Sequence, residues 1–134
     1  MTVVLDSWAV LRLLGGAEPT ATRVQDLLDR EPPVMSWINL GEVSYIVSRD
    51  QGPADADRVV RDLRPLLRLD LPTEQRVLDA ARIKATHPMA YADAFAAATA
   101  LAHDATLWTG APELLSEDAA WTFEDLRGSA VDHR

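Results

Sequence analysis

The chain has 134 residues, with 21 acidic and 13 basic side chains, a formal net charge of −8 and no cysteine. The lack of cysteine excludes a disulfide framework, cysteine-ligated zinc sites and thiol catalysis. The excess of acids argues against a protein that grips nucleic acid through a broad basic surface of its own. It leaves open a site in which carboxylates hold a divalent cation and the cation meets a phosphate.

The length predicts a single domain over residues 1–134 with one hydrophobic core. The longest strongly apolar stretch without a charge, Ala94 to His103, is too short to span a bilayer. Asp6 interrupts the N-terminal sequence before a signal-peptide core could form. We therefore expect a cytoplasmic protein without a membrane segment.

Apolar runs and helix-boundary residues define the expected elements in chain order. They predict a strand at 2–5, helices at 8–14 and 20–30, a strand at 34–36, helices at 38–50 and 53–66, a weak strand at 67–69, helices at 73–86 and 91–103, and strands at 105–109 and 121–126. Thr20 and Thr73 are the expected N-caps of their helices. Strands separated by helices indicate parallel pairing, so the predicted fold class is α/β: a three-layer α/β/α domain with a central parallel sheet of four to five short strands.

The working site of such a sheet lies beyond the carboxyl ends of its strands, near the point where strand order reverses. Two positions fall there by sequence: Asp6 after the first strand, and the turn at Gly110 and Ala111 after the strand that ends at Thr109. An aspartate directly before a helix is also a good N-cap, so Asp6 has a structural explanation as well as a functional one.

Two further carboxylates, like Asp6, have both a structural and a functional explanation. Helical spacing places Glu42 between Ile38, Tyr45 and Ile46, on an apolar stripe where a carboxylate needs a cation or a donor. Arg49, seven residues on, offers a plain ion pair instead. Asp93 falls in the first turn of its helix, where the helix dipole alone favours an acid.

Taken together, Asp6, Glu42 and Asp93 lie on three separate elements and make a plausible site for a hard cation such as Mg²⁺. Other chemistries find no support, because the sequence has no G-x-S-x-G, Walker, G-x-G-x-x-G or H-E-x-x-H motif. His87, His103 and His133 share no ligand spacing and are expected at the surface or at helix ends. The four tryptophans are expected in the core or in dimer contacts.

Four sequence blocks resemble the PIN-domain ribonucleases, specifically the VapC-type toxins of bacterial type II toxin–antitoxin systems. The blocks are Val3-Val4-Leu5-Asp6, Ser36-Trp37-Ile38-Asn39-Leu40-Gly41-Glu42-Val43, Tyr91-Ala92-Asp93-Ala94-Phe95-Ala96-Ala97-Ala98 and Leu107-Trp108-Thr109-Gly110. Their order and spacing run over nearly the whole chain, and the Y-A-D-A-F block is the most distinctive.

The resemblance implies a PIN-like fold and metal-dependent hydrolysis of structured RNA such as tRNA or ribosomal RNA. It implies that Asp6 and Asp93 hold Mg²⁺ or Mn²⁺, and that Glu42 orients the metal or its water. It also implies a homodimer and a cognate VapB-type antitoxin whose tail covers the active groove. Arg12 and Arg49 are local candidates for contact with RNA.

One position departs from the family pattern. Where the family usually reads T-G-D-P-E, this chain reads Thr109-Gly110-Ala111-Pro112-Glu113, so Ala111 stands at the fourth acidic position. The sequence leaves open whether Glu113 reaches the site, whether one or two metals bind, and whether Ala111 is natural or engineered. It therefore allows two functions: a ribonuclease, attenuated or not, and an inactive PIN-fold protein that acts by binding an antitoxin and regulating their shared promoter.

Overall fold

The computed structural model describes residues 1–128. Its elements in chain order are β1 (Val3–Leu5), α1 (Ser7–Gly15), α2 (Thr20–Arg30), β2 (Val34–Ser36), α3 (Trp37–Gln51), α4 (Pro53–Leu63), the 3-10 turn η1 (Arg64–Leu66), β3 (Arg68–Asp70), α5 (Glu74–Thr86), α6 (Tyr91–Ala102), β4 (Thr106–Thr109), the 3-10 turn η2 (Pro112–Leu114) and β5 (Thr122–Asp125). Within residues 1–128, no helix combines the length and apolar character that a membrane crossing requires.

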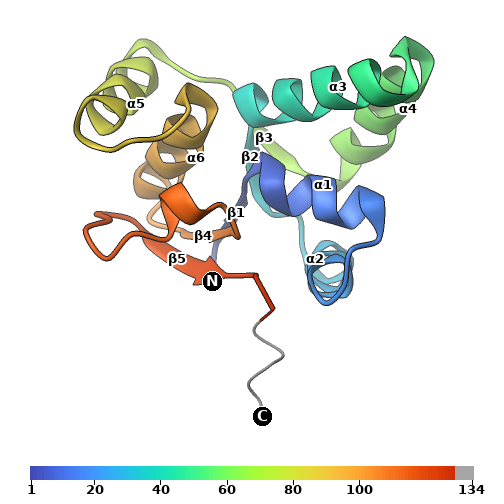
Figure 1. Ribbon diagram of the computed structural model, residues 1–134, viewed down its shortest axis with the longest axis horizontal. Coiled ribbons are helices and arrows are strands. Elements are labelled where there is room, and N and C mark those ends of the chain that lie inside the picture. Colours follow the sequence, from blue (N-terminus) through green and yellow to red (C-terminus); the bar gives the residue numbers. More distant parts are fainter. Residues whose placement is uncertain (129–134) are drawn as a thin grey trace.

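The five strands form one parallel sheet in the order β3-β2-β1-β4-β5. The chain therefore starts in the middle of the sheet, adds β2 and β3 on one side, and returns to place β4 and β5 on the other (Figure 1). Strand order reverses between β1 and β4, where Leu5 is paired with Trp108. The predicted three-layer fold and its parallel sheet are confirmed, with five strands.

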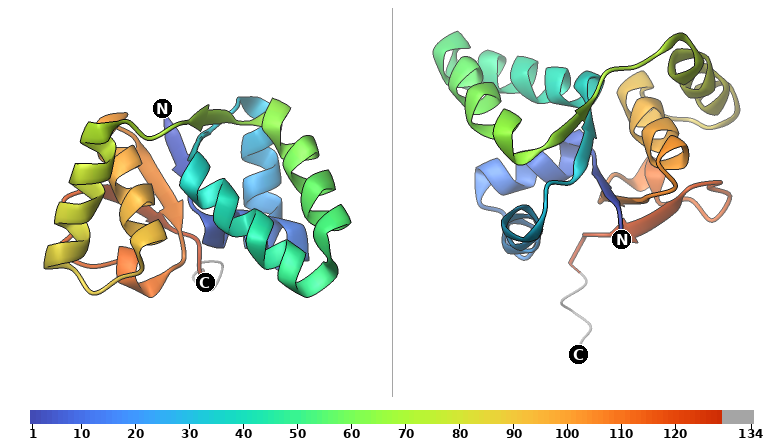
Figure 2. Two further views of the ribbon diagram at one scale, coloured as in Figure 1. Left: turned by 90° about the horizontal axis from the view of Figure 1, so that it is seen from above. Right: turned by 180° about the vertical axis from the view of Figure 1, so that it is seen from behind.

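Helices α1 to α4 lie on one side of the sheet and α5 and α6 on the other (Figure 2). The central strand β1 is buried on both faces, which explains its continuous apolar run: Val3 and Leu5 pack in one core cluster and Val4 in the other. Helix α6 packs between the sheet and α5, and five of its alanines are buried: Ala94, Ala96, Ala97, Ala98 and Ala100. Small side chains allow this helix to approach the sheet closely.

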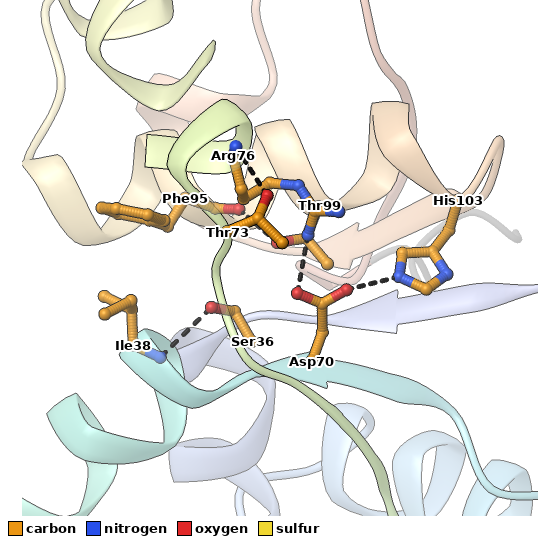
Figure 3. Close-up of polar contacts among 8 residues, drawn as sticks. All are labelled: Ser36, Ile38, Asp70, Thr73, Arg76, Phe95, Thr99 and His103. Carbon is orange, nitrogen blue, oxygen red and sulfur yellow. Dashed lines mark hydrogen bonds and ion pairs between the residues drawn. The ribbon is translucent and has the colours of Figure 1, made fainter. Parts of the chain in front are cut away.

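Edge strand β3 is joined to the second helical layer by one carboxylate (Figure 3). Asp70 accepts hydrogen bonds from Arg76 at 2.7 Å and His103 at 2.6 Å. Burial alone would raise the pKa of Asp70, but these two partners outweigh it and hold the pKa below its usual value. Thr73 caps α5 through the Arg76 amide at 3.2 Å, as predicted.

The predicted role of Thr20 was wrong. The residue at the N-cap position of α2 is Pro19, which has no side-chain cap hydrogen bond. The Thr20 hydroxyl donates instead to the backbone carbonyl of Leu126 at 2.9 Å, and Glu18 accepts from the Thr22 amide at 3.0 Å. Thr20 is buried, so its hydroxyl needs a partner from the segment packed against it rather than from its own helix.

Candidate active site

Asp6 lies where β1 ends and α1 begins, and it is only 1% exposed. One carboxylate oxygen accepts from the Ala9 amide at 2.9 Å, so the residue is the N-cap of α1. The other oxygen accepts a hydrogen bond from the Thr109 hydroxyl at the end of β4. That hydroxyl in turn accepts from the Ala111 amide at 3.0 Å. Asp6 is therefore fixed at the junction of the two central strands.

The environment of Asp6 disfavours its charged form. The pKa of Asp6 is raised to about 7, mainly by burial. The hydrogen bonds from Thr109 and Ala9 oppose this rise, and the nearby charge of Asp93 contributes to it. An N-cap aspartate at a helix surface needs no such burial. The structural role that the sequence suggested for Asp6 is present, and it coexists with an electrostatically strained carboxylate.

Asp93 lies in the first turn of α6 and is half-buried. Its pKa is raised to about 6, mainly by burial and then by the negative charges of Glu113 and Glu42. Because α6 leads directly into β4, its first turn lies at the same edge of the sheet as the end of β1 (Figure 1). The fold thus places Asp93 near Glu42 and within electrostatic reach of Asp6.

A cavity of about 290 Å³, the acidic cavity, opens at this edge. Its walls include three carboxylates and the side chains beside them: Glu42, Asp93, Glu113, Trp8, Ala111 and Pro112. Asp6 is not part of the lining and acts on the cavity through Asp93. The arrangement concentrates negative charge in a small hollow, which favours a cation or protons there.

Asn39 positions the elements that carry these carboxylates, a role that the sequence did not reveal. Its side-chain amide donates to the backbone carbonyl of Ala92 at 3.0 Å and to the Ser7 hydroxyl at 3.4 Å. That hydroxyl in turn donates to the backbone carbonyl of Asn39 at 3.1 Å. Ala92 and Ser7 directly adjoin Asp93 and Asp6 in the chain. Asn39 therefore joins α3, which carries Glu42, to the helices next to both aspartates.

The predicted surroundings of Glu42 were right for one neighbour and wrong for two. Ile46 lines the acidic cavity together with Glu42. Ile38 and Tyr45, however, are 39% and 57% exposed, because α3 turns a different apolar face, formed by Leu40, Val43 and Val47, to the protein interior. Arg49 is paired with Asp50 at 2.9 Å, not with Glu42. Glu42 has no ion pair within residues 1–128 and lines the acidic cavity instead.

Position 111 contributes no acid, but Glu113 lies close by. Ala111 is buried and lines the acidic cavity, and η2 returns Glu113 to the same wall. Among the neighbouring charges, that of Glu113 does most to raise the pKa of Asp93. Pro112 had made this approach hard to judge from the sequence. The one available signal was the acid two residues beyond the missing one.

The donor chemistry of the cavity suits a hydrated hard cation. Within the described part of the chain, no three histidine or acidic side chains are gathered tightly enough to enclose an ion. Mg²⁺ does not require such a cage, since it is usually held by one or two carboxylates and keeps several waters. Burial is the main cause of the raised pKa values of Asp6 and Asp93, and neighbouring carboxylates add to it; a bound cation would favour the charged form of both groups. The residues therefore fit Mg²⁺ or Mn²⁺ held with part of its water shell.

Neither His87 nor His103 lines this cavity. His103 is paired with Asp70, and the His87 ring packs on Trp121 with ring centroids 5.2 Å apart. Both follow the last residue of a helix, as expected. His133 lies outside the described residues.

Residues 3–124 match the PIN domain family. The chain belongs to the PIN-domain family. No curated protein matches the chain significantly in sequence.

Solved structures share this PIN fold. VapBC2 from Rickettsia felis, bound to a DNA fragment from its promoter, aligns with a TM-score of 0.73 at 16% identity, over 93% of this chain and 98% of that chain. VapBC-1 from nontypeable Haemophilus influenzae aligns with a TM-score of 0.72 at 24% identity, over 94% of this chain and 98% of that chain. VapC20 from Mycobacterium tuberculosis, a toxin that cleaves the sarcin-ricin loop, aligns with a TM-score of 0.65 at 17% identity, over 79% and 87%. The predicted PIN fold is confirmed.

Proposed function

We propose that this PIN domain is a metal-dependent endoribonuclease, the toxin of a VapBC-type toxin–antitoxin module, and that it cleaves structured RNA such as tRNA or ribosomal RNA. One observation carries the proposal: Asp93, Glu113 and Glu42 line one cavity, where burial and then the charges of the two glutamates raise the pKa of Asp93. Three carboxylates around one cavity at the carboxyl edge of the sheet repel one another. A bound divalent cation would offset this repulsion.

Different residues of the chain would hold the metal, orient its waters and position the carboxylates. Asp93 would hold Mg²⁺ or Mn²⁺ from the cavity wall, and Asp6, which is buried behind this wall and interacts with Asp93, would be the second aspartate of the family pattern. Glu42 and Glu113 would orient the waters of the ion from the cavity wall. When bound, the ion supplies an activated water and neutralises charge on the phosphate. Thr109 and the Ala9 amide keep Asp6 in one orientation, and Asn39 keeps α3 in register with α1 and α6.

The proposal includes two partners. The VapBC complexes with the same fold support a VapB-type antitoxin as the binding partner of this chain. The exposed apolar side chains of α3, Ile38 and Tyr45, support a homodimer because burying them would remove apolar surface from water. Cleavage requires the acidic cavity to stay open toward the RNA in the homodimer, whereas the antitoxin would cover it.

A second function is favoured by Ala111. A buried alanine that lines the acidic cavity, at the position where the related sequences carry an acid, reduces the number of ligands available to a metal. On this alternative the chain is inactive as a nuclease and acts by binding its antitoxin and regulating their shared promoter.

Cleavage of total tRNA and ribosomal RNA by the chain and by Ala111→Asp, with Mg²⁺, Mn²⁺ or EDTA, separates the two functions. We expect discrete cuts by the chain as written that EDTA abolishes, and faster cleavage by Ala111→Asp. Cuts by the Ala111→Asp variant alone would identify the chain as written as an attenuated nuclease. An absence of cuts from both, with intact antitoxin binding, would favour the second function.

A further inference from the structure

A second hollow adjoins the acidic cavity. It has a volume of about 430 Å³, and its lining includes Trp8 and Pro112, which also line the acidic cavity. A polymer bound in one hollow can therefore continue into the other past the Trp8 ring. We call the second hollow the Trp8 subsite.

The Trp8 ring packs directly against Gly110, in the turn that follows β4. A Cβ at Gly110 would lie 2.3 Å from the outer atoms of the indole ring, so only glycine fits at this position. Trp8 also belongs to the first turn of α1, two residues after Asp6. The ring is thus a fixed wall shared by the two hollows.

Arg12 lies over this ring one helical turn further along α1. Its guanidinium carbon is 4.4 Å from the ring centroid, a cation–π distance. Within residues 1–128 no carboxylate forms an ion pair with Arg12. In a chain with eight more acids than bases, a guanidinium without a counter-charge next to an acidic cavity is unexpected.

The other charges of the Trp8 subsite are already engaged. Arg127 donates to Asp125 through two side-chain bonds at 3.1 and 3.0 Å. Glu18 accepts from the Thr22 amide at 3.0 Å and the Thr22 hydroxyl at 2.8 Å. Arg12 is therefore the group in this hollow that is best prepared to bind an anion.

The chemistry of Arg12 on Trp8 fits a nucleotide. A guanidinium next to an indole offers π surfaces on which a base can stack, and its N–H groups can donate to a phosphate. A peptide carboxylate would use the charge of Arg12 but would leave the π surfaces of the guanidinium and the indole unused.

We propose that the Trp8 subsite binds the RNA nucleotide next to the phosphate cleaved in the acidic cavity, with Arg12 as its binding residue. This inference rests on the proposed ribonuclease function, because it extends the path of the same substrate.

The test is direct binding of a fluorescent single-stranded RNA in EDTA, which prevents cleavage, to the full chain and its Arg12→Gln variant. Stacking on such platforms contributes about 1–3 kcal/mol per base, so we expect Arg12→Gln to weaken binding roughly fivefold or more. The slope of log affinity against log salt is expected to fall by about 0.7, the value for one lost phosphate contact on a single strand. Arg12→Lys, which keeps the charge but not the planar surface, should restore the salt slope and only part of the affinity.

Arg23→Gln is the matched control. Arg23 also lies over a tryptophan, 5.3 Å from the Trp108 ring centroid, but it is paired with Glu124 at 2.9 Å and lines neither hollow. This variant should bind RNA as the unmodified chain does. Equal affinity of Arg12→Gln and the unmodified chain would overturn the subsite, and so would a loss of antitoxin binding without a loss of RNA binding. RNA binding that depends on Arg12, in a chain that cleaves nothing, would keep the subsite and refute the nuclease.

Discussion

The Thr109 hydroxyl at the end of β4 donates a hydrogen bond to the carboxylate of Asp6 at the end of β1. The two residues are 103 positions apart and meet where strand order reverses. The same carboxylate caps α1 and is almost completely buried. One side chain thus connects the middle of the sheet, the first helix and the acidic cavity.

Asp6→Asn is expected to stabilise the metal-free protein in a pH-dependent way. Burial raises the pKa of Asp6 from 3.8 to about 7, so between these values the folded state holds a proton that the unfolded state has lost. Stability therefore falls as pH rises through this window. Each unit of pKa difference corresponds to about 1.4 kcal/mol, so the advantage of the variant should reach a few kcal/mol above about pH 8 and vanish below about pH 4.

Urea unfolding of both proteins with EDTA at several pH values measures this difference. Asparagine is also a good N-cap, so α1 should be retained. A constant difference at all pH values would contradict the assignment of the raised pKa to Asp6.

Glu113→Gln is expected to lower the pKa of Asp93, because it removes the largest of the neighbouring charges that raise it. Glu42→Gln should act in the same direction with a smaller effect. NMR titration of the Asp93 carboxyl carbon measures both. Glu117→Gln, an exposed acid a few residues beyond η2, is the control and should leave the Asp93 titration unchanged. An unaltered Asp93 pKa in Glu113→Gln would remove Glu113 from the site.

Asn39→Ala is expected to destabilise the fold by about 1–3 kcal/mol, because the Ala92 carbonyl and the Ser7 hydroxyl each lose a buried donor. Ser44→Ala, on the same helix without these contacts, should change stability by less than about 0.5 kcal/mol. Chemical denaturation compares the three proteins. If the two variants were equally stable, Asn39 would not hold α3 against the other helices.

Asp70→Asn is expected to destabilise the attachment of β3 to the second helical layer. It removes the counter-charge of Arg76 and His103, and the Arg76 side chain is only 13% exposed. Because the pKa of Asp70 is lower in the folded state than in the unfolded state, its charged form stabilises the fold at pH values above 3.8. This stabilisation is lost as the pH falls through the pKa that Asp70 has in the folded state. The stability difference between the two proteins should therefore be largest near neutral pH and shrink below pH 3.8. Thermal unfolding at neutral and acid pH measures it.

The strands and most helices could be predicted because their signals are local. Val3, Val4 and Leu5 form a continuous apolar run, and such runs indicate strands covered on both faces. The place of Asp6 followed from a general property of parallel sheets, whose carboxyl ends meet at one edge.

The features that were missed depend on tertiary contacts. The pairing of Asp70 with His103 spans 33 positions, and no periodicity records it. Asn39 was overlooked because Ile38 and Tyr45 suggested a buried face that the packed helix leaves in solvent. The approach of Glu113 depends on the turn geometry after Pro112, which residue types alone do not determine.

The most direct test of the central claim is RNA cleavage with Mn²⁺ by the chain as written and by Asp93→Asn. Asparagine preserves the shape of a residue in the first turn of α6 while removing its charge, so the fold should remain intact by circular dichroism. We predict discrete, EDTA-sensitive cuts from the chain and their loss, by at least about a hundredfold, in Asp93→Asn. Equal cleavage by the two proteins would contradict a metal-dependent active site in the acidic cavity.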